Sequence, residues 1–147
     1  MNLRLKTAFC LNALVSAGLM ASGLRYLLSP QVMPYHLQVI NRSWGDLDSR
    51  LQIMLLGFLK LGGAGMLTVG AAIALLLIPF SYGHTWAHRA ILVISIVYSA
   101  LVFYIAHSLH YSTGASTPWS AGVIMMAVAV TAYLLTIGAE RKPTPIN

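Results

Sequence analysis

Histidine is the residue type with the most chemical potential in this sequence, which has five histidines and only three acidic residues. His107 and His110 lie three residues apart, a spacing that places both imidazole rings on one face of a helix. His36 lies in an earlier polar connection with Asp46 and Asp48, and we expect that connection on the same side of the molecule. Neutral imidazole nitrogens and carboxylates are ligands for zinc and copper. One interpretation is therefore a metal site formed by His36, His107 and His110.

The same histidines also fit a simpler role at a membrane surface. His84 and His88 form a second pair with a four-residue spacing, and all four paired histidines are expected at helix ends. Tryptophan and tyrosine residues lie close to them, and such residues gather where membranes meet water. Neither pair comes with the glutamate of a metalloprotease helix, and no histidine lies near a helix centre, as bis-histidine haem ligation requires. We therefore predict no cofactor, with zinc or copper at the first site as the alternative.

Lys60 is the second candidate, because an ionisable side chain at membrane depth is a functional residue by default. It interrupts the longest apolar stretch, 51–80, which would form a helix of about 45 Å. Such a helix is longer than the ~30 Å of hydrocarbon that it must cross. Lys60 therefore lies either inside the bilayer, as a minimal transporter would need, or at its boundary. At the boundary its stem would lie in lipid and its ammonium group would reach the headgroups.

The composition shows why the chain offers so few chemical groups. Hydrophobic residues make up 58% of it and charged residues 8%, and the mean hydropathy is +0.76. A chain of 147 residues has too much surface to hide that much apolar side chain from water, which predicts a membrane protein. The nine Lys and Arg residues exceed the three acidic residues, but they are scattered and flank apolar runs. They indicate membrane anchors in a lipid bilayer and no nucleic-acid partner.

Four apolar runs predict four transmembrane helices, over approximately 7–28, 55–80, 90–107 and 119–138. Ser29-Pro30 ends the first run, acidic residues before Ser49 favour an early start for the second, and Pro79 marks its end. The segment 107–116 is expected to be a polar connection with a flexible point at Gly114. We therefore expect a single all-α membrane domain, a bundle of four transmembrane helices.

Small residues predict where these helices approach one another closely, because lipid gives apolar helix faces no drive to associate. The first run has Ala13, Ala17 and Ala21 at four-residue spacing, and the second run is rich in glycine. We expect these residues to form the packing faces of a compact bundle.

The distribution of Lys and Arg predicts the orientation in the membrane. The N-terminal segment, the connection after the second run and the C-terminal tail together hold five of these residues, and the first connection holds three. More basic residues are found on the cytoplasmic side, so both termini are expected in the cytoplasm. The connections 29–48 and 107–118 would then lie on the outer face.

Several short phrases resemble those of a group of small four-helix bacterial inner-membrane proteins. They are Tyr26-Leu27-Leu28-Ser29-Pro30, Met33-Pro34-Tyr35-His36, Trp44, and Thr113-Gly114-Ala115-Ser116-Thr117-Pro118-Trp119. The resemblance extends over nearly the whole chain. It implies a multi-pass protein of the bacterial inner membrane and carries no activity over to any residue.

Polar and aromatic residues converge in the two outer connections, which is where we expect a binding surface. Its candidate residues are Tyr35, His36, Trp44, His107, His110 and Trp119. No carboxylate lies inside any span and no second cysteine accompanies Cys10, so a non-enzymatic role is favoured. We expect the outer face to bind a small apolar ligand or a partner, such as another membrane protein or a second copy. A metal-dependent membrane enzyme and a minimal transporter are the alternatives.

Overall fold

The computed structural model describes residues 2–138 and confirms an all-α membrane fold over this range. In chain order the elements are α1 (Leu3–Leu28), α2 (Pro34–Ile40), the short 3-10 helix η1 (Trp44–Asp46), α3 (Ser49–Ser81), α4 (Thr85–Thr113) and α5 (Trp119–Thr136). The helices α1, α3, α4 and α5 are each long and apolar enough to cross a membrane. The basic residues of the C-terminal tail that entered the orientation count lie outside the described residues.

The third helix, α3, begins early, as the acidic residues before it predicted. Oδ1 of Asp48 accepts hydrogen bonds from the backbone N–H groups of Arg50 and Leu51, at 2.9 and 3.1 Å. These bonds satisfy two of the donors that a helix start leaves without partners. The prediction that Pro79 ends this helix is wrong, because α3 continues through it to Ser81. Proline removes one N–H donor there, but the last turn still closes.

The helix α4 departs most from its predicted span, 90–107, because it runs from Thr85 to Thr113. It ends at Gly114, whose φ of 70° is the left-handed conformation that glycine adopts most readily. The N–H of Gly114 bonds the carbonyl of His110 at 2.8 Å. The connection expected at 107–116 is therefore shorter than predicted, and His107 and His110 lie in the last turns of a helix.

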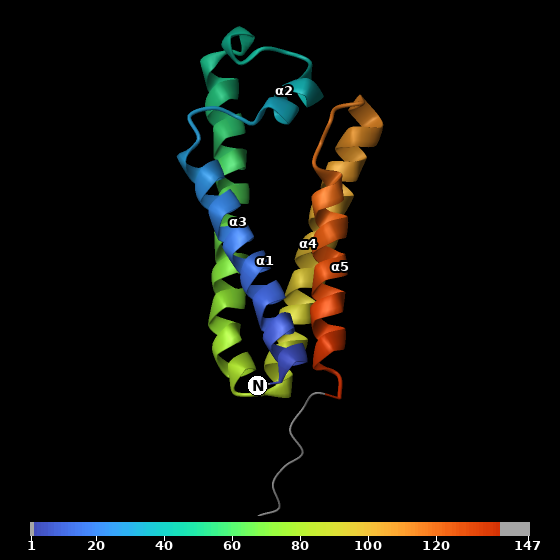
Figure 1. Ribbon diagram of the computed structural model, residues 1–147. Coiled ribbons are helices and arrows are strands. Elements are labelled where there is room, and N and C mark those ends of the chain that lie inside the picture. Colours follow the sequence, from blue (N-terminus) through green and yellow to red (C-terminus); the bar gives the residue numbers. More distant parts are fainter. Residues whose placement is uncertain (1, 139–147) are drawn as a thin grey trace, which may run out of the picture.

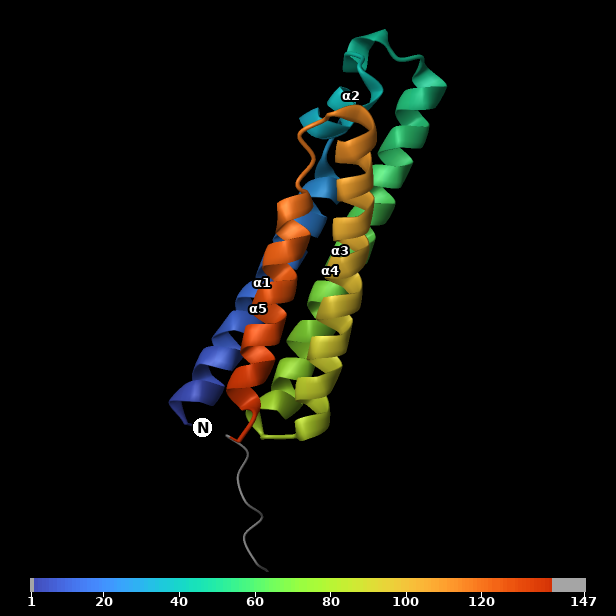
Figure 2. The same cartoon turned by 90° about the vertical axis from the view of Figure 1, so that its right-hand side faces the viewer.

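The four long helices form two pairs that diverge toward one end of the molecule. The α1/α3 pair and the α4/α5 pair have the most extensive contacts between elements. Figure 1 shows both pairs meeting near the N-terminus and separating toward α2, and Figure 2 shows the same elements from the side. We refer to the pairs as the α1/α3 arm and the α4/α5 arm, and to the two ends of the bundle as the terminal end and the α2 end.

Small residues hold each arm together, but not all of those that the sequence indicated. A Cβ placed on Gly23 would lie 2.6 Å from the carbonyl oxygen of Gly63, so the backbones of α1 and α3 touch at this point. A Cβ placed on Gly70 would likewise meet the backbone of α1, at Ser16. The hydroxyl of Ser16 donates a hydrogen bond to the carbonyl of Gly70 at 2.7 Å. The predicted alanine face of the first helix is not the contact face, because Ala17 is exposed. Lipid-facing and helix-facing alanines look alike in a sequence of this composition.

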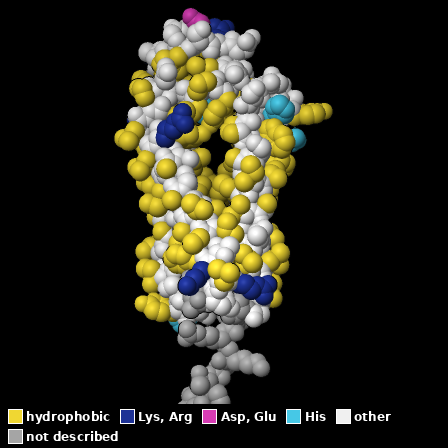
Figure 3. All heavy atoms as spheres, viewed as in Figure 1, with side chains coloured by type: hydrophobic (Ala, Val, Ile, Leu, Met, Phe, Trp, Pro, Cys, Tyr) yellow, Lys and Arg dark blue, Asp and Glu magenta, His cyan; other side chains and the backbone are white. Residues whose placement is uncertain are grey.

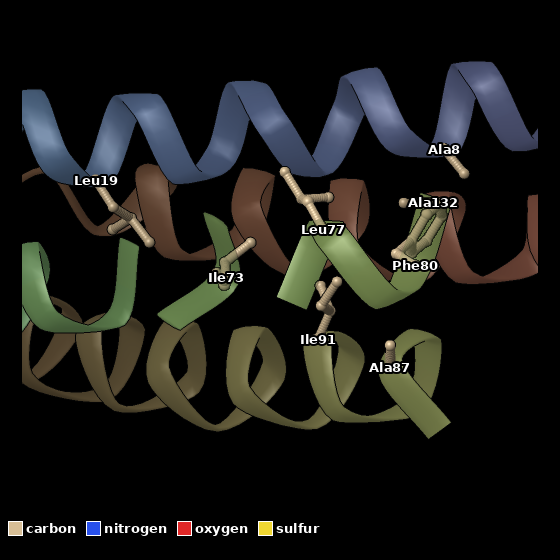
Figure 4. Packing of buried hydrophobic residues seen from close by; sticks show 8 residues of the cluster. All are labelled: Ala8, Leu19, Ile73, Leu77, Phe80, Ala87, Ile91 and Ala132. Atoms are coloured by element: carbon tan, nitrogen blue, oxygen red, sulfur yellow. The ribbon is translucent and has the colours of Figure 1, made fainter. Parts of the chain in front are cut away.

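The buried core lies at the terminal end and explains why the arms meet there. It comprises Ala8, Leu19, Ile73, Leu77, Phe80, Ala87, Ile91 and Ala132, which come from all four long helices (Figure 4). Three of these are alanines with no exposed surface, and a methyl side chain lets neighbouring backbones approach closely. At the α2 end the two arms lie apart instead (Figure 1).

Candidate ligand site at the α2 end

An opening passes between the two arms just below α2. Figure 3 shows it as a gap through the molecule that is bordered mainly by hydrophobic side chains. α2 and the connection that follows α4 close its upper side (Figure 1). The helices on both sides of the opening are long and apolar enough to cross a membrane.

A cluster of aromatic rings joins α1 to α2 at this opening. The hydroxyl groups of Tyr26 and Tyr35 are hydrogen-bonded to each other. The ring of His36 lies 4.2 Å from that of Tyr35 and 6.4 Å from that of Tyr26, measured between ring centroids. We call Tyr26, Tyr35 and His36 the tyrosine–histidine cluster. Tyr98 of α4, on the opposite arm, is half-buried and packs against the core at the terminal end.

Burial keeps the α2 members of this cluster uncharged. It raises the pKa of Tyr35 well above its ordinary value, the hydrogen bond from Tyr26 adds to the effect, and Arg25 opposes it weakly. Burial lowers the pKa of His36, because removal from water disfavours the imidazolium. At neutral pH the cluster therefore offers neutral phenol and imidazole groups.

A small hydrophobic cluster holds α2 against the α1/α3 arm. Its buried members are Val32, Met33 and Leu59, and the partly buried Trp44 packs against them. The backbone carbonyl of Trp44 accepts a hydrogen bond from Nε2 of Gln52 at 2.8 Å. Trp44 therefore contributes to the support beneath α2.

Trp119 organises a second group of rings, on the α4/α5 arm. His107 stacks on Phe103 with a centroid distance of 5.3 Å, and both rings lie within 6.4 Å of Trp119. His110 also contacts Trp119, at 6.4 Å, and its Nδ1 hydrogen-bonds the carbonyl of Ala115 at 2.7 Å. Each histidine therefore has a packing or hydrogen-bonding partner in the bend between α4 and α5.

One side-chain hydrogen bond connects α2 to the opposite arm. Oε1 of Gln38 accepts from the backbone N–H of Ser116 at 3.0 Å. In the same connection between α4 and α5, the hydroxyl of Thr117 donates a hydrogen bond to the carbonyl of Ala106 at 2.6 Å. This bond holds the connection against α4. α2 thus spans the opening from one arm to the other.

Comparison with other proteins gives no family for this arrangement. No protein-family model matches the chain, and no similar chain is found among curated proteins or solved structures. Function must be argued from the geometry of this chain alone.

The six predicted binding residues all lie at the α2 end, but the structure divides them. Tyr35 and His36 belong to the tyrosine–histidine cluster, whereas His107, His110 and Trp119 belong to the ring group of the α4/α5 arm. Trp44 belongs to neither ring group and packs in the hydrophobic cluster beneath α2. Within residues 2–138 there is no group of three or more His, Cys, Asp or Glu side chains placed to hold a metal ion. The structure therefore does not bring His36, His107 and His110 together as a three-ligand set.

Lys60 lies on the exposed surface of α3, near the level at which α1 ends. Its position can be read from Gly63, three residues further along α3, where a Cβ would meet the backbone of Gly23 and Leu27. Lys60 is therefore about 4.5 Å nearer the α2 end than this contact. That places it beside the final turn of α1, which ends at Leu28. This position suits a lysine that anchors the helix at a membrane boundary.

Sequence reasoning missed one residue of this region as a site candidate. Tyr26 lies inside the first apolar run, and the sequence gives no sign that it meets Tyr35. A tyrosine inside a membrane span is itself a usable signal, because a buried hydroxyl group needs a hydrogen-bonding partner. Which partner it finds depends on the packing of distant helices.

Proposed function

We propose that this protein binds a small apolar ligand from the lipid bilayer, without catalysing a reaction on it. The observation that carries the proposal is the opening between the two arms, bordered by hydrophobic side chains and closed on one side by α2. Ligand sites in proteins are concave, mostly apolar and supplied with a few polar groups, and they occur between the helices of bundles. The tyrosine–histidine cluster supplies such polar groups here.

A small ligand fits this opening better than a protein partner does. The opening lies between helices of a single chain, and a partner would meet only its rim. Apolar molecules dissolved in the bilayer, in contrast, reach it by lateral diffusion. We further propose that the chain lies in the bacterial inner membrane with both termini in the cytoplasm, so that the α2 end is its outer face. The 5:3 distribution of Lys and Arg along the sequence supports this orientation.

The proposal is tested by extracting the protein with its surrounding lipid, exchanging it into dodecyl maltoside, and identifying retained apolar compounds by mass spectrometry. We expect one compound class to be retained at near-stoichiometric amounts. A Tyr98→Ala variant should retain less of it, because Tyr98 is the half-buried tyrosine of α4 and packs against the core where the two arms meet. A Tyr104→Ala variant is the control, since Tyr104 is 69% exposed on the same helix. Retention of bulk lipid only, or equal retention by both variants, would contradict the proposal.

The orientation has its own test. Cysteine-accessibility labelling or reporter fusions at the two termini should place both in the cytoplasm, and an N- or C-terminus outside would overturn the assignment. Co-purification of a stoichiometric protein instead of a small molecule would support the partner-binding alternative and count against the ligand.

A further inference from the structure

The tyrosine–histidine cluster has hydrogen-bonding capacity that the described residues do not use. Nδ1 of His36 is buried and has no hydrogen-bond partner among them. In the Tyr26–Tyr35 pair one hydroxyl donates to the other, so the accepting hydroxyl keeps a hydrogen with no acceptor within residues 2–138. A buried polar atom without a partner is destabilising, and Nδ1 of His36 is such an atom. Both unused atoms belong to rings that contact one another.

The cluster lies between apolar support and the opening to lipid. Tyr26 and Tyr35 pack against the buried side chains of Val32, Met33 and Leu59, which leaves this side of the cluster dry. On the other side, α2, which carries Tyr35 and His36, borders the opening between the arms (Figures 1 and 3). A ligand whose chain occupies the opening would therefore bring its end group to the unused hydroxyl and imidazole.

We propose that the tyrosine–histidine cluster binds the polar end of the ligand, and that this end is an uncharged hydroxyl or carbonyl group on an apolar chain. This inference rests on the proposed function. A ligand hydroxyl can accept from the free tyrosine O–H and donate to an unprotonated Nδ1 of His36. A ligand carbonyl can accept from the tyrosine O–H and from a protonated Nδ1. Either group satisfies both unused atoms with one ligand oxygen.

A charged end group fits this cluster less well. Phenol and neutral imidazole offer no full charge to compensate for the removal of a carboxylate or phosphate from water, which is costly without a counter-charge. Arg25 is exposed and lines a depression with Ser29 and Gln31, next to Val32 and Met33. An anionic ligand would be expected to use that depression and not the rings.

The experiment compares three chains of equal length that differ only in their end group. The protein in dodecyl maltoside is labelled with a photoreactive, diazirine-bearing hexadecanol, and unlabelled 1-hexadecanol, palmitate or hexadecane is added as competitor. We expect 1-hexadecanol to compete about tenfold more strongly than hexadecane, as one or two net hydrogen bonds would give. Tyr35→Phe and His36→Phe should abolish this preference. Tyr111→Phe is the matched control, because Tyr111 is 87% exposed.

The outcomes separate this inference from the function on which it rests. Equal competition by hexadecane and 1-hexadecanol would leave apolar binding in place and overturn the assignment of the cluster. Strongest competition by palmitate, lost in Arg25→Gln, would also overturn it in favour of an anionic ligand. Failure of all three chains to compete would contradict the proposed function itself.

A second readout does not depend on the folding of variants. In wild-type protein with ¹⁵N-labelled histidine, 1-hexadecanol should shift the His36 ring nitrogen resonances, and hexadecane should leave them unchanged. Equal shifts with both chains would count against a hydrogen bond to His36.

Discussion

The close contact between α1 and α3 at Gly63 gives the sharpest prediction for stability. A Cβ on Gly63 would lie 2.8 Å from the carbonyl oxygen of Gly23 and 2.8 Å from Cβ of Tyr26. Both separations are about 0.7 Å shorter than the ~3.5 Å at which non-bonded atoms attract. One of the two opposing atoms belongs to a helix backbone, so a rotamer change cannot relieve the clash. Gly63→Ala should therefore force the two helices apart.

The neighbouring glycine provides a matched control. A Cβ on Gly62 meets nothing within 4 Å, although it lies in the same helix at nearly the same depth. Both alanine substitutions gain the same helix propensity, so this contribution cancels in the comparison. The remaining difference is the cost of overpacking, typically about 1–3 kcal/mol. We therefore expect Gly63→Ala to be less stable than Gly62→Ala by that amount.

The two free energies of unfolding can be compared by titrating dodecyl maltoside micelles with sodium dodecyl sulfate and following helix content by far-UV circular dichroism. Gly63→Ala should also weaken competition by 1-hexadecanol, because the displaced atom is part of Tyr26, and Gly62→Ala should not. Equal stability of the two variants would refute the contact geometry on which the α1/α3 arm is based.

Three further predictions concern α2 and the start of α3. Replacing Gln38 by alanine removes the acceptor of the Ser116 N–H, so amide hydrogen exchange at Ser116 should accelerate by up to about tenfold, while exchange within α4 should not change. Asp48→Ala should lower the free energy of unfolding by about 1 kcal/mol through loss of the α3 cap, and Asp48→Asn should largely retain it; an equal loss in both variants would exclude capping as the cause. Burial lowers the pKa of His36, so below its ordinary value of about 6.5 the unfolded chain binds a proton that the folded chain does not. Stability should therefore fall as the pH drops from about 7.5 to about 5.5, and a fall of the same size in His36→Phe would show that another group is responsible.

Hydropathy could predict the four spans because a long apolar run has one stable location, the bilayer interior. The cap at Asp48 was also predictable, since its effect is confined to the next few residues. The short helix α2 was not, because seven residues are too few to show a helical period and its support comes from residues such as Leu59 in α3. The extension of α4 to Thr113 was not predicted, because the polar residues after 106 indicated a connection. The helix in fact continues until Gly114, which caps its C-terminus.

The candidate site was predictable only in part for a related reason. Tyr35 and His36 could be singled out as polar aromatic residues in a connection, but their partner Tyr26 comes from a span. In lipid, small residues decide where helices touch, and a sequence with many alanines and glycines allows several contact faces. The choice between Ala17 and Gly23 as the contact on α1 depends on which residue meets a glycine of α3.

The opening between the arms is itself a consequence of folding in lipid. In water, an apolar gap of this kind would close, because apolar surface is driven out of contact with water. In a bilayer its walls can be covered by acyl chains at little cost, so no hydrophobic force draws the arms together. Alanines bring the arms together at the terminal end, whereas at the α2 end the Ser116 N–H donates a hydrogen bond across the gap to Gln38. A molecule that fills the opening and also bonds the tyrosine–histidine cluster would gain what acyl chains cannot provide, which is why selectivity for this ligand should arise at its polar end.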